Sequence, residues 1–390
     1  MTNQINIADY LNPVKPDAVL ELKDHPKFNS MLASIAIYSD EKKLPEYKAF
    51  DIAIIGVEED RNSNNKPCGT APNKIRNLFY RLYKPTQAVK IVDLGNLKQG
   101  QTVNDTYFGL AEILSHLIEC NILPVIIGGS QDLTYSNYLA YEKLERQINI
   151  VAIDSKLNLG NADEEFTSES YLSKIILRNA KYLFNYTNLG FQSYYVDPDE
   201  LELMKKMYFD AVRLGIVHED LRETEPLLRD ADLLTFDITA IRQSDAPANK
   251  FPSPNGLSGE EACQIAKYAG LSDRLTSFGI YEINPQYDIN NQTQQLAAQI
   301  IWYFIDGYYQ RKNDYPKTNI EQYIKFIVNL QQINQEINFY KSQKTNRWWV
   351  EVPVVDKRES VIVSCSYNDY QKASNQEIPD RWWNTYQKIC

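Results

Sequence analysis

The sequence is poor in the side chains that bind transition metals. It has only three histidines in 390 residues, and its five cysteines are scattered, with no Cys-x-x-Cys pair. An odd number of scattered cysteines is typical of free thiols, and it argues against a disulfide framework or a zinc site. We expect the three imidazoles to be packed or surface groups; they are His25, His116 and His218.

The sequence also lacks an excess of basic residues and any long apolar run. Its net charge is -10, which excludes nonspecific nucleic-acid binding because that binding needs a basic face. No apolar segment is long enough to span a membrane, and the first residues lack the pattern of a signal peptide. We therefore expect a cytoplasmic protein with neither a nucleic-acid partner nor a membrane span.

From about residue 50, apolar runs typical of buried strands alternate eight times with helical patterns, which predicts an α/β fold with a mainly parallel sheet. Capping signals agree with this map: Glu261 follows Ser258 at the spacing of a capping box, and Asp197 precedes Pro198. The same periodicity would also fit a closed β/α barrel, so it does not by itself decide between a barrel and an open sheet. The predicted strands are 51–57, 88–94, 123–127, 148–153, 183–191, 209–214, 233–236 and 275–283. The predicted helices are 71–82, 102–120, 133–144, 167–178, 198–207, 219–229, 258–269 and 292–309.

Polar residues follow three of these strands directly. They form the segments Gly128-Gly129-Ser130-Gln131-Asp132, Asp154-Ser155-Lys156-Leu157-Asn158 and Asp237-Ile238-Thr239. Side chains just past the carboxyl ends of parallel strands line the binding crevice of an open α/β sheet. We therefore expect these segments to form the functional site.

The order and spacing of the three segments resemble the ureohydrolase superfamily of arginase, agmatinase and formimidoylglutamase. Four flanking stretches also match it: Gly69 to Arg76, Asp93 to Asn96, Ser244 to Leu257 and Glu282 to Pro285. The motif in Ser244 to Leu257 resembles that of the formimidoylglutamases in particular. The resemblance implies a three-layer αβα sandwich with an eight-stranded, mostly parallel open sheet over about residues 50–309.

In that family the three motifs hold two manganese ions, and the resemblance implies which residues stand at the ligand positions here. Asp154 and Asp237 are kept. Gln131 and Lys156 stand where the family has histidines, and Asn158 and Thr239 stand where it has aspartates. Amide and hydroxyl oxygens are neutral ligands, and an ammonium repels a metal ion. We therefore expect no metal cofactor.

The Lys156 ammonium is the expected replacement for the metals. Two facing aspartates repel each other, and one lysine could neutralise both through charge-assisted hydrogen bonds. The alternative is one weakly bound manganese ion on Asp154 and Asp237, with Asp132 as a further ligand.

Other residues are candidates for ligand binding or proton transfer. The resemblance implies that Glu282 faces a cationic substrate group, and that Asn255 belongs to a substrate loop; Asp132 is a third candidate. General acid–base catalysis would depend on Glu164, Glu165 or Tyr171, because no histidine lies between Asn158 and Lys174.

The chain divides into an N-terminal lead (1–49), the α/β domain (50–309) and a C-terminal extension (310–390). The extension contains two Arg-Trp-Trp triplets, at Arg347 and Arg381. We expect a polar linker at 310–317, a helix at 319–330 and a strand at 360–364. The tryptophans are expected to pack on the core or at an interface.

Two hypotheses follow for the function. The first is a pseudoenzyme: a ureohydrolase-fold protein, nearest the formimidoylglutamase branch, that has lost dinuclear manganese hydrolysis and keeps a binding, regulatory or structural role. The second is an active hydrolase of formimino or guanidino C–N bonds with an atypical metal site. A small amino-acid-like ligand or a protein partner fits the first hypothesis, and the resemblance implies a homo-oligomer.

Overall fold

The computed structural model describes residues 6–15, 29–39, 43–160, 166–316, 319–331, 335–354 and 359–389. Within them, one large sheet has the strand order β1-β4-β3-β5-β10-β9-β6-β7-β8, and β2 also pairs with β4. All neighbours from β4 to β8 along this order are parallel, so the prediction of an eight-stranded parallel open sheet is confirmed. The strands are β3 (Ile52–Gly56), β4 (Ile91–Leu97), β5 (Leu123–Ile127), β6 (Ile148–Ile153), β7 (Leu183–Phe191), β8 (Asp210–Arg213), β9 (Leu233–Asp237) and β10 (Ser277–Tyr281).

The N-terminal lead adds two short strands that the sequence did not reveal. These are β1 (Leu11–Asn12), antiparallel to β4, and β2 (Ile35–Ile37), parallel to it. Strands of two and three residues carry too little periodicity to be recognised in a sequence. They lie along the outer edge of β4, where they shield part of an otherwise unpaired strand.

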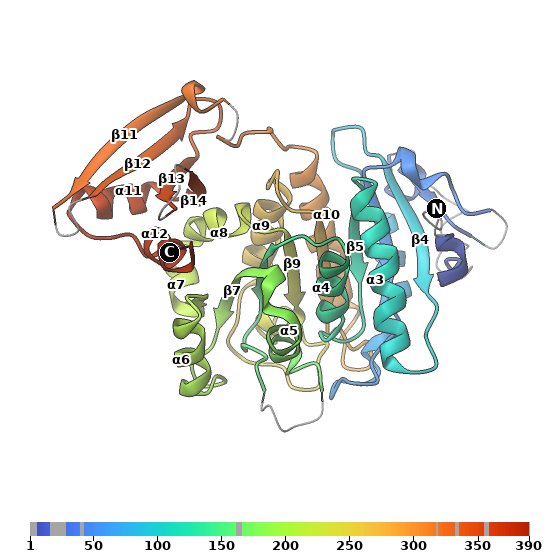
Figure 1. Cartoon of the computed structure of the whole chain (residues 1–390). Helices are drawn as coiled ribbons and strands as arrows, with labels where there is room; N and C mark the ends of the chain where they lie inside the picture. Colours follow the sequence, from blue (N-terminus) through green and yellow to red (C-terminus); the bar gives the residue numbers. More distant parts are fainter. Residues whose placement is uncertain are drawn as a thin grey trace.

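Helices cover both faces of the sheet and complete the three-layer sandwich (Figure 1). Alternate residues of each strand supply two separate cores: in β5, Val125 and Ile127 belong to one and Ile126 to the other. The first core is closed by α2 (Ala71–Arg81), α7 (Leu214–Glu219), α8 (Glu225–Arg229), α9 (Gly259–Gly270) and α10 (Gln292–Tyr308). The second is closed by α3 (Val103–Glu119), α4 (Leu133–Lys143), α5 (Tyr171–Asn179) and α6 (Pro198–Lys206).

The predicted helix starts are confirmed at two positions. Ser258 and Glu261 form the reciprocal capping box of α9, and the Asp197 side chain accepts a hydrogen bond from Asp199 N at the start of α6. The predicted helix 219–229 is wrong in its extent, because it breaks into a 3-10 turn and the short helix α8. Pro226, which can only occupy the first turn of a helix, restarts the helix there.

The C-terminal extension is a four-stranded antiparallel meander with two helices (Figure 1). Its elements are β11 (Tyr323–Leu330), β12 (Gln335–Ser342), β13 (Trp348–Pro353), β14 (Ser360–Cys365), α11 (Tyr367–Ser374) and α12 (Asp380–Ile389). The predicted helix at 319–330 is wrong: eight residues of this segment pair with β12 as a strand. Apolar residues such as Ile324, Ile327 and Val328 fit both periods, and cross-strand pairing decides between them.

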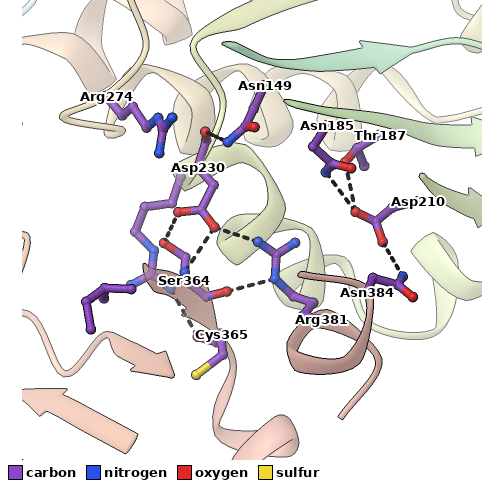
Figure 2. Close-up of polar contacts among 12 residues, drawn as sticks. Asn149, Asn185, Thr187, Asp210, Asp230, Arg274, Ser364, Cys365, Arg381 and Asn384 are labelled. Carbon is purple, nitrogen blue, oxygen red and sulfur yellow. Dashed lines mark hydrogen bonds and ion pairs between the residues drawn. The ribbon is translucent and has the colours of Figure 1, made fainter. Parts of the chain in front are cut away.

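The extension has its own apolar core, built around Trp348, Phe339 and Trp382. It meets the α/β domain through a polar seam, which we define as Asp210, Asp230 and Arg274 with Ser364 and Arg381 (Figure 2). In the seam, Asp230 accepts hydrogen bonds from Ser364 N at 2.9 Å and from Arg381 at 2.6 Å. Beside it, the Arg229 guanidinium lies 4.5 Å from the ring centroid of Trp349.

None of the helices in the described ranges is long and apolar enough to cross a membrane.

Candidate functional site

A cleft of about 420 Å³ opens at the carboxyl ends of β6, β9 and β10. The three central strands are neighbours in the sheet, so the residues that follow them meet at one place. The cleft brings together six residues that the sequence singled out: Asp154, Lys156, Asn158, Asp237, Thr239 and Glu282. We call this the strand-end cleft.

Asp154, which directly follows β6, has both of its carboxylate oxygens engaged by its own loop. Oδ1 accepts a hydrogen bond from Lys156 N at 2.9 Å, and Oδ2 accepts one from the side-chain amide of Asn158. Asn158 has a φ of 55°, a left-handed conformation that asparagine tolerates better than most residues. Burial, with repulsion from Asp237, raises the pKa of Asp154.

Asp237 ends β9 and caps the short 3-10 turn that follows. Its Oδ1 accepts a hydrogen bond from Thr239 N at 2.7 Å, so Thr239 acts on the aspartate through its backbone. The Thr239 hydroxyl lies 3.4 Å from the hydroxyl of Ser155. Burial raises the pKa of Asp237, because little solvent remains to stabilise the carboxylate charge.

The expected hydrogen bonds from Lys156 Nζ to the two aspartates are not formed. Lys156 Nζ pairs instead with Glu169 at 2.6 Å, and within the described residues no ion pair joins it to Asp154 or Asp237. Although burial disfavours its charge, the hydrogen bond with Glu169 raises the pKa of Lys156. The ammonium still lowers the pKa values of both aspartates at longer range, against the larger effect of burial. A long flexible side chain can reach several partners, and sequence proximity to Asp154 did not decide among them.

Glu282 follows β10 and has a φ of 62°, which turns its side chain back into the cleft. Its carboxylate accepts hydrogen bonds from Ser63 Oγ at 2.9 Å, Asn65 Nδ2 at 3.2 Å and Gln131 N at 2.9 Å. Burial and the charge of Asp237 raise its pKa. Three neutral donors orient this carboxylate, and none of them cancels its charge.

Gln131 and Asp132 do not line the cleft. Gln131 Nε2 donates to Thr235 Oγ1 at 2.9 Å, and its Oε1 is buried with no hydrogen-bond partner in the described part of the chain. Asp132 is fully buried, where it accepts a hydrogen bond from Tyr107 OH. Both side chains are held among packed groups at the start of α4.

The remaining candidates lie at the margin of the site or outside it. Asn255 is exposed at the rim, and its Nδ2 donates to Tyr194 OH at 3.2 Å. Tyr171 is fully buried, with its hydroxyl 3.0 Å from that of Tyr186, so it does not line the cleft. Glu164 and Glu165 lie outside the described residues.

Several cleft residues were missed in the sequence. Ser63 and Asn65 come from the loop between β3 and α2, Glu169 precedes α5, and Tyr195 and Phe251 come from two other loops. Ser63 and Asn65 come after the carboxyl end of β3, and this position was the one sequence feature that could have predicted them as cleft residues. Loop residues such as Phe251 carry no periodicity that would place them.

The donor set does not fit a pair of manganese ions. Two carboxylates and no imidazole face the cleft from the six family ligand positions, and Asn158 turns its N–H group toward Asp154. Lys156 adds a cation close to where the ions would lie. In the described ranges, no group of three or more His, Cys, Asp and Glu side chains could hold a metal ion.

A parallel open sheet between two helical layers, with a polar cleft at its carboxyl edge, defines a three-layer α/β protein of the arginase type. The model of the Arginase family matches residues 50–306. The chain therefore belongs to the arginase family. Within it, the resemblance is to the formimidoylglutamases.

Two curated relatives illustrate this resemblance. A formimidoylglutamase of Staphylococcus haemolyticus is 27% identical over 266 residues, which cover 65% of this chain and 85% of the relative. A formimidoylglutamase of Streptococcus gordonii is 23% identical over 286 residues, which cover 68% and 86%.

Solved structures agree on the fold. The formiminoglutamase of Trypanosoma cruzi with Mn²⁺ superposes with a TM-score of 0.63 at 18% identity, covering 69% of this chain and 96% of that one. The formimidoylglutamase of Bacillus subtilis gives a TM-score of 0.64 at 18% identity, covering 73% and 93%. At this identity the likeness concerns the fold alone.

Proposed function

We propose that this protein is a pseudoenzyme of the arginase family that binds a small ligand in the strand-end cleft and has lost dinuclear manganese hydrolysis. One observation carries the proposal: both oxygens of Asp154 accept hydrogen bonds from its own loop, from Lys156 N and from the Asn158 amide. These hydrogen bonds leave Asp154 one free lone pair on each oxygen, and the altered family positions Gln131, Lys156, Asn158 and Thr239 add no carboxylate or imidazole with which Asp154 could hold two ions.

The chemistry of the cleft supports the same proposal. Metal-activated hydrolysis uses the ion to generate hydroxide near neutral pH. Without a metal, the cleft would need a general base beside a bound water, and its carboxylates already accept protein hydrogen bonds. Binding requires only the shape and the charge of the cleft, and both remain.

The test is manganese binding to the purified chain, measured by calorimetry and by metal analysis after gel filtration. The matched control is the variant Gln131→His, Lys156→His, Asn158→Asp, Thr239→Asp, which restores the four family ligands. We expect no stoichiometric manganese on the unaltered chain and a gain of binding in the control variant. Two manganese ions per unaltered chain would contradict the proposal.

The second hypothesis, an active hydrolase of formimino or guanidino C–N bonds, is tested with the same protein. Incubation with formiminoglutamate, arginine and agmatine in the presence of manganese should release no product above the level seen with the Asp154→Ala, Asp237→Ala variant. Turnover that this double variant abolishes would favour the active enzyme.

A further inference from the structure

The strand-end cleft contains three buried carboxyl groups that no cationic side chain of the described residues contacts. Asp154, Asp237 and Glu282 are 1%, 6% and 5% exposed, and all three line the cleft. Within the described residues, none of them forms an ion pair with a lysine, an arginine or a histidine. Their hydrogen bonds come from neutral donors, namely backbone N–H, amide and hydroxyl groups. A buried carboxylate without a compensating cation is costly, so the cleft favours a positive ligand.

The ammonium already in the cleft does not satisfy this need. Lys156 is the one cationic side chain among the lining residues, and its Nζ is paired with a fourth carboxylate, Glu169, at 2.6 Å. That pair is neutral as a unit. The other three carboxyl groups, which form the floor of the cleft, therefore remain without a cationic partner, and a bound cation would favour their charged forms.

The mouth of the cleft is aromatic. Phe251 and Tyr195 line it and are 60% and 42% exposed, although large aromatic side chains normally bury most of their area. Tyr194 packs edge-on against Tyr195 with their ring centroids 4.7 Å apart. Two exposed aromatic rings above an anionic floor suit a ligand that has a cationic head and a flat apolar body.

A second positive group at the mouth would be repelled. The Lys250 ammonium lies 5.1 Å from the ring centroid of Phe251, and Lys250 itself is exposed. A ligand with ammonium groups at both ends would place one of them near this lysine. The charge arrangement therefore selects a single cationic head.

We propose that the strand-end cleft binds a monocationic arylalkyl ammonium ion, with its ammonium among Asp154, Asp237 and Glu282 and its ring between Tyr195 and Phe251. This inference rests on the proposed function, since it requires a cleft that binds an organic ligand without metal. It assigns the ligand class from charge and shape, and no bond is formed or broken.

The test is calorimetric titration of the full chain at pH 7.5 with 2-phenylethylamine as the probe. Three comparison compounds test the features of the ligand one by one. 2-Phenylethanol lacks the charge, phenylalanine adds a carboxylate, and 1,4-diaminobutane has two ammonium groups and no ring. We expect 2-phenylethylamine to bind at least tenfold more tightly than each of them. Equal or tighter binding of any of the three would overturn the inference.

Two variants locate the site. Phe251→Ala and Asp237→Asn should each weaken 2-phenylethylamine at least fivefold, through loss of the ring contact and of one negative charge. The matched control is Phe108→Ala, which removes a phenylalanine of α3 that is 52% exposed and lies outside the cleft, and it should leave affinity unchanged. An equal loss in Phe108→Ala, or no loss in Phe251→Ala, would overturn the assignment.

The two proposals fail in different ways. Two manganese ions on the unaltered chain would refute the pseudoenzyme, and the ligand assignment would fall with it. A chain that binds no manganese and prefers phenylethanol to phenylethylamine would refute the ligand class alone.

Discussion

The strand-end cleft and the polar seam of the extension both gather buried charges, and they treat them in opposite ways. In the seam, Asp230 is paired with Arg381 at 2.6 Å (Figure 2). Arg274 of the seam pairs with the neighbouring Asp232 at 2.9 Å. In the cleft, three carboxylates accept only neutral donors. Asp230 of the seam thus has a cationic partner, whereas the three carboxyl groups of the cleft have none.

This difference distinguishes charges that stabilise the fold from charges that are available to bind a ligand. A buried ion pair with further hydrogen bonds repays part of its desolvation cost, and removing one partner exposes the full cost of the other. An uncompensated cluster works the other way, because removing one charge relieves repulsion. We therefore expect the protein to lose stability when either partner of the Asp230–Arg381 pair is removed, and to gain it when a carboxyl group of the cleft is made neutral.

The largest effect is expected for Asp230→Ala in the seam. This change leaves the Arg381 guanidinium buried without its partner and removes the acceptor of Ser364 N and Oγ. We expect the free energy of unfolding to fall by about 3–5 kcal/mol, the typical cost of breaking a buried pair. Urea unfolding followed by tryptophan fluorescence reports this change, since the extension holds the Trp-rich segments.

The control for that measurement is Glu202→Gln, which removes a carboxylate from an exposed pair with Lys205. Its effect should be much smaller than that of Asp230→Ala, because solvent screens an exposed pair. Similar losses in both variants would mean that the seam pair is no more important than a surface pair.

An intermediate effect is expected for Lys388→Met at the edge of the seam. Burial lowers the pKa of Lys388 to about 8 from its ordinary 10.5, and its Nζ donates to Asn185 Oδ1. The folded state therefore favours the neutral amine, so the wild type loses stability as pH falls from about 10.5 to about 8. Methionine removes this penalty, and we expect a gain of about 1–2 kcal/mol at pH 7, allowing for partial exposure.

The gain in Lys388→Met should fall to a small remainder near pH 10.5, where the wild-type amine is neutral in the folded state and half deprotonated in the unfolded state. Unfolding curves at pH 7 and pH 10.5 check this sign. The exposed Lys205→Met is the control and should show no such pH dependence. A gain of the same size at both pH values would show that burial of the charge is not its cause.

The smallest effect is expected for Asp237→Asn in the cleft. The amide oxygen can still accept the hydrogen bond from Thr239 N, while the charge that burial opposes is removed. We expect the unliganded chain to gain about 1 kcal/mol at pH 8, measured by thermal unfolding. The isosteric change in the seam, Asp230→Asn, should destabilise. Destabilisation by both would remove the contrast between the two regions.

Strand-end residues could be located from the sequence because parallel strands deliver them to one edge. Asp154, Asp237 and Glu282 end or directly follow β6, β9 and β10, and a buried apolar run is easy to recognise. What each side chain touches could not be predicted. Lys156 lies two residues from Asp154 and pairs with Glu169, thirteen positions away, and no local sequence pattern indicates that partner.

The extension was harder to predict than the α/β domain for a related reason. Tyr323 to Leu330 contains apolar residues at both helical and strand spacing, and its state depends on pairing with β12. The seam depends on contacts between distant segments, such as Arg381 with Asp230. No local pattern reports such contacts, whereas capping at Ser258 involves a partner three residues away and was recognised.

The distance along the chain between the two halves of the seam also affects how the protein is made. Asp230 and Arg381 are 151 positions apart. At a synthesis rate of about 5–20 residues per second, Asp230 leaves the ribosome roughly 8–30 s before Arg381, which neutralises it. During that interval Asp210 and Asp230 lack their α12 partners Asn384 and Arg381, so the newly made α/β domain must be stable without its extension or depend on chaperones until α12 is made.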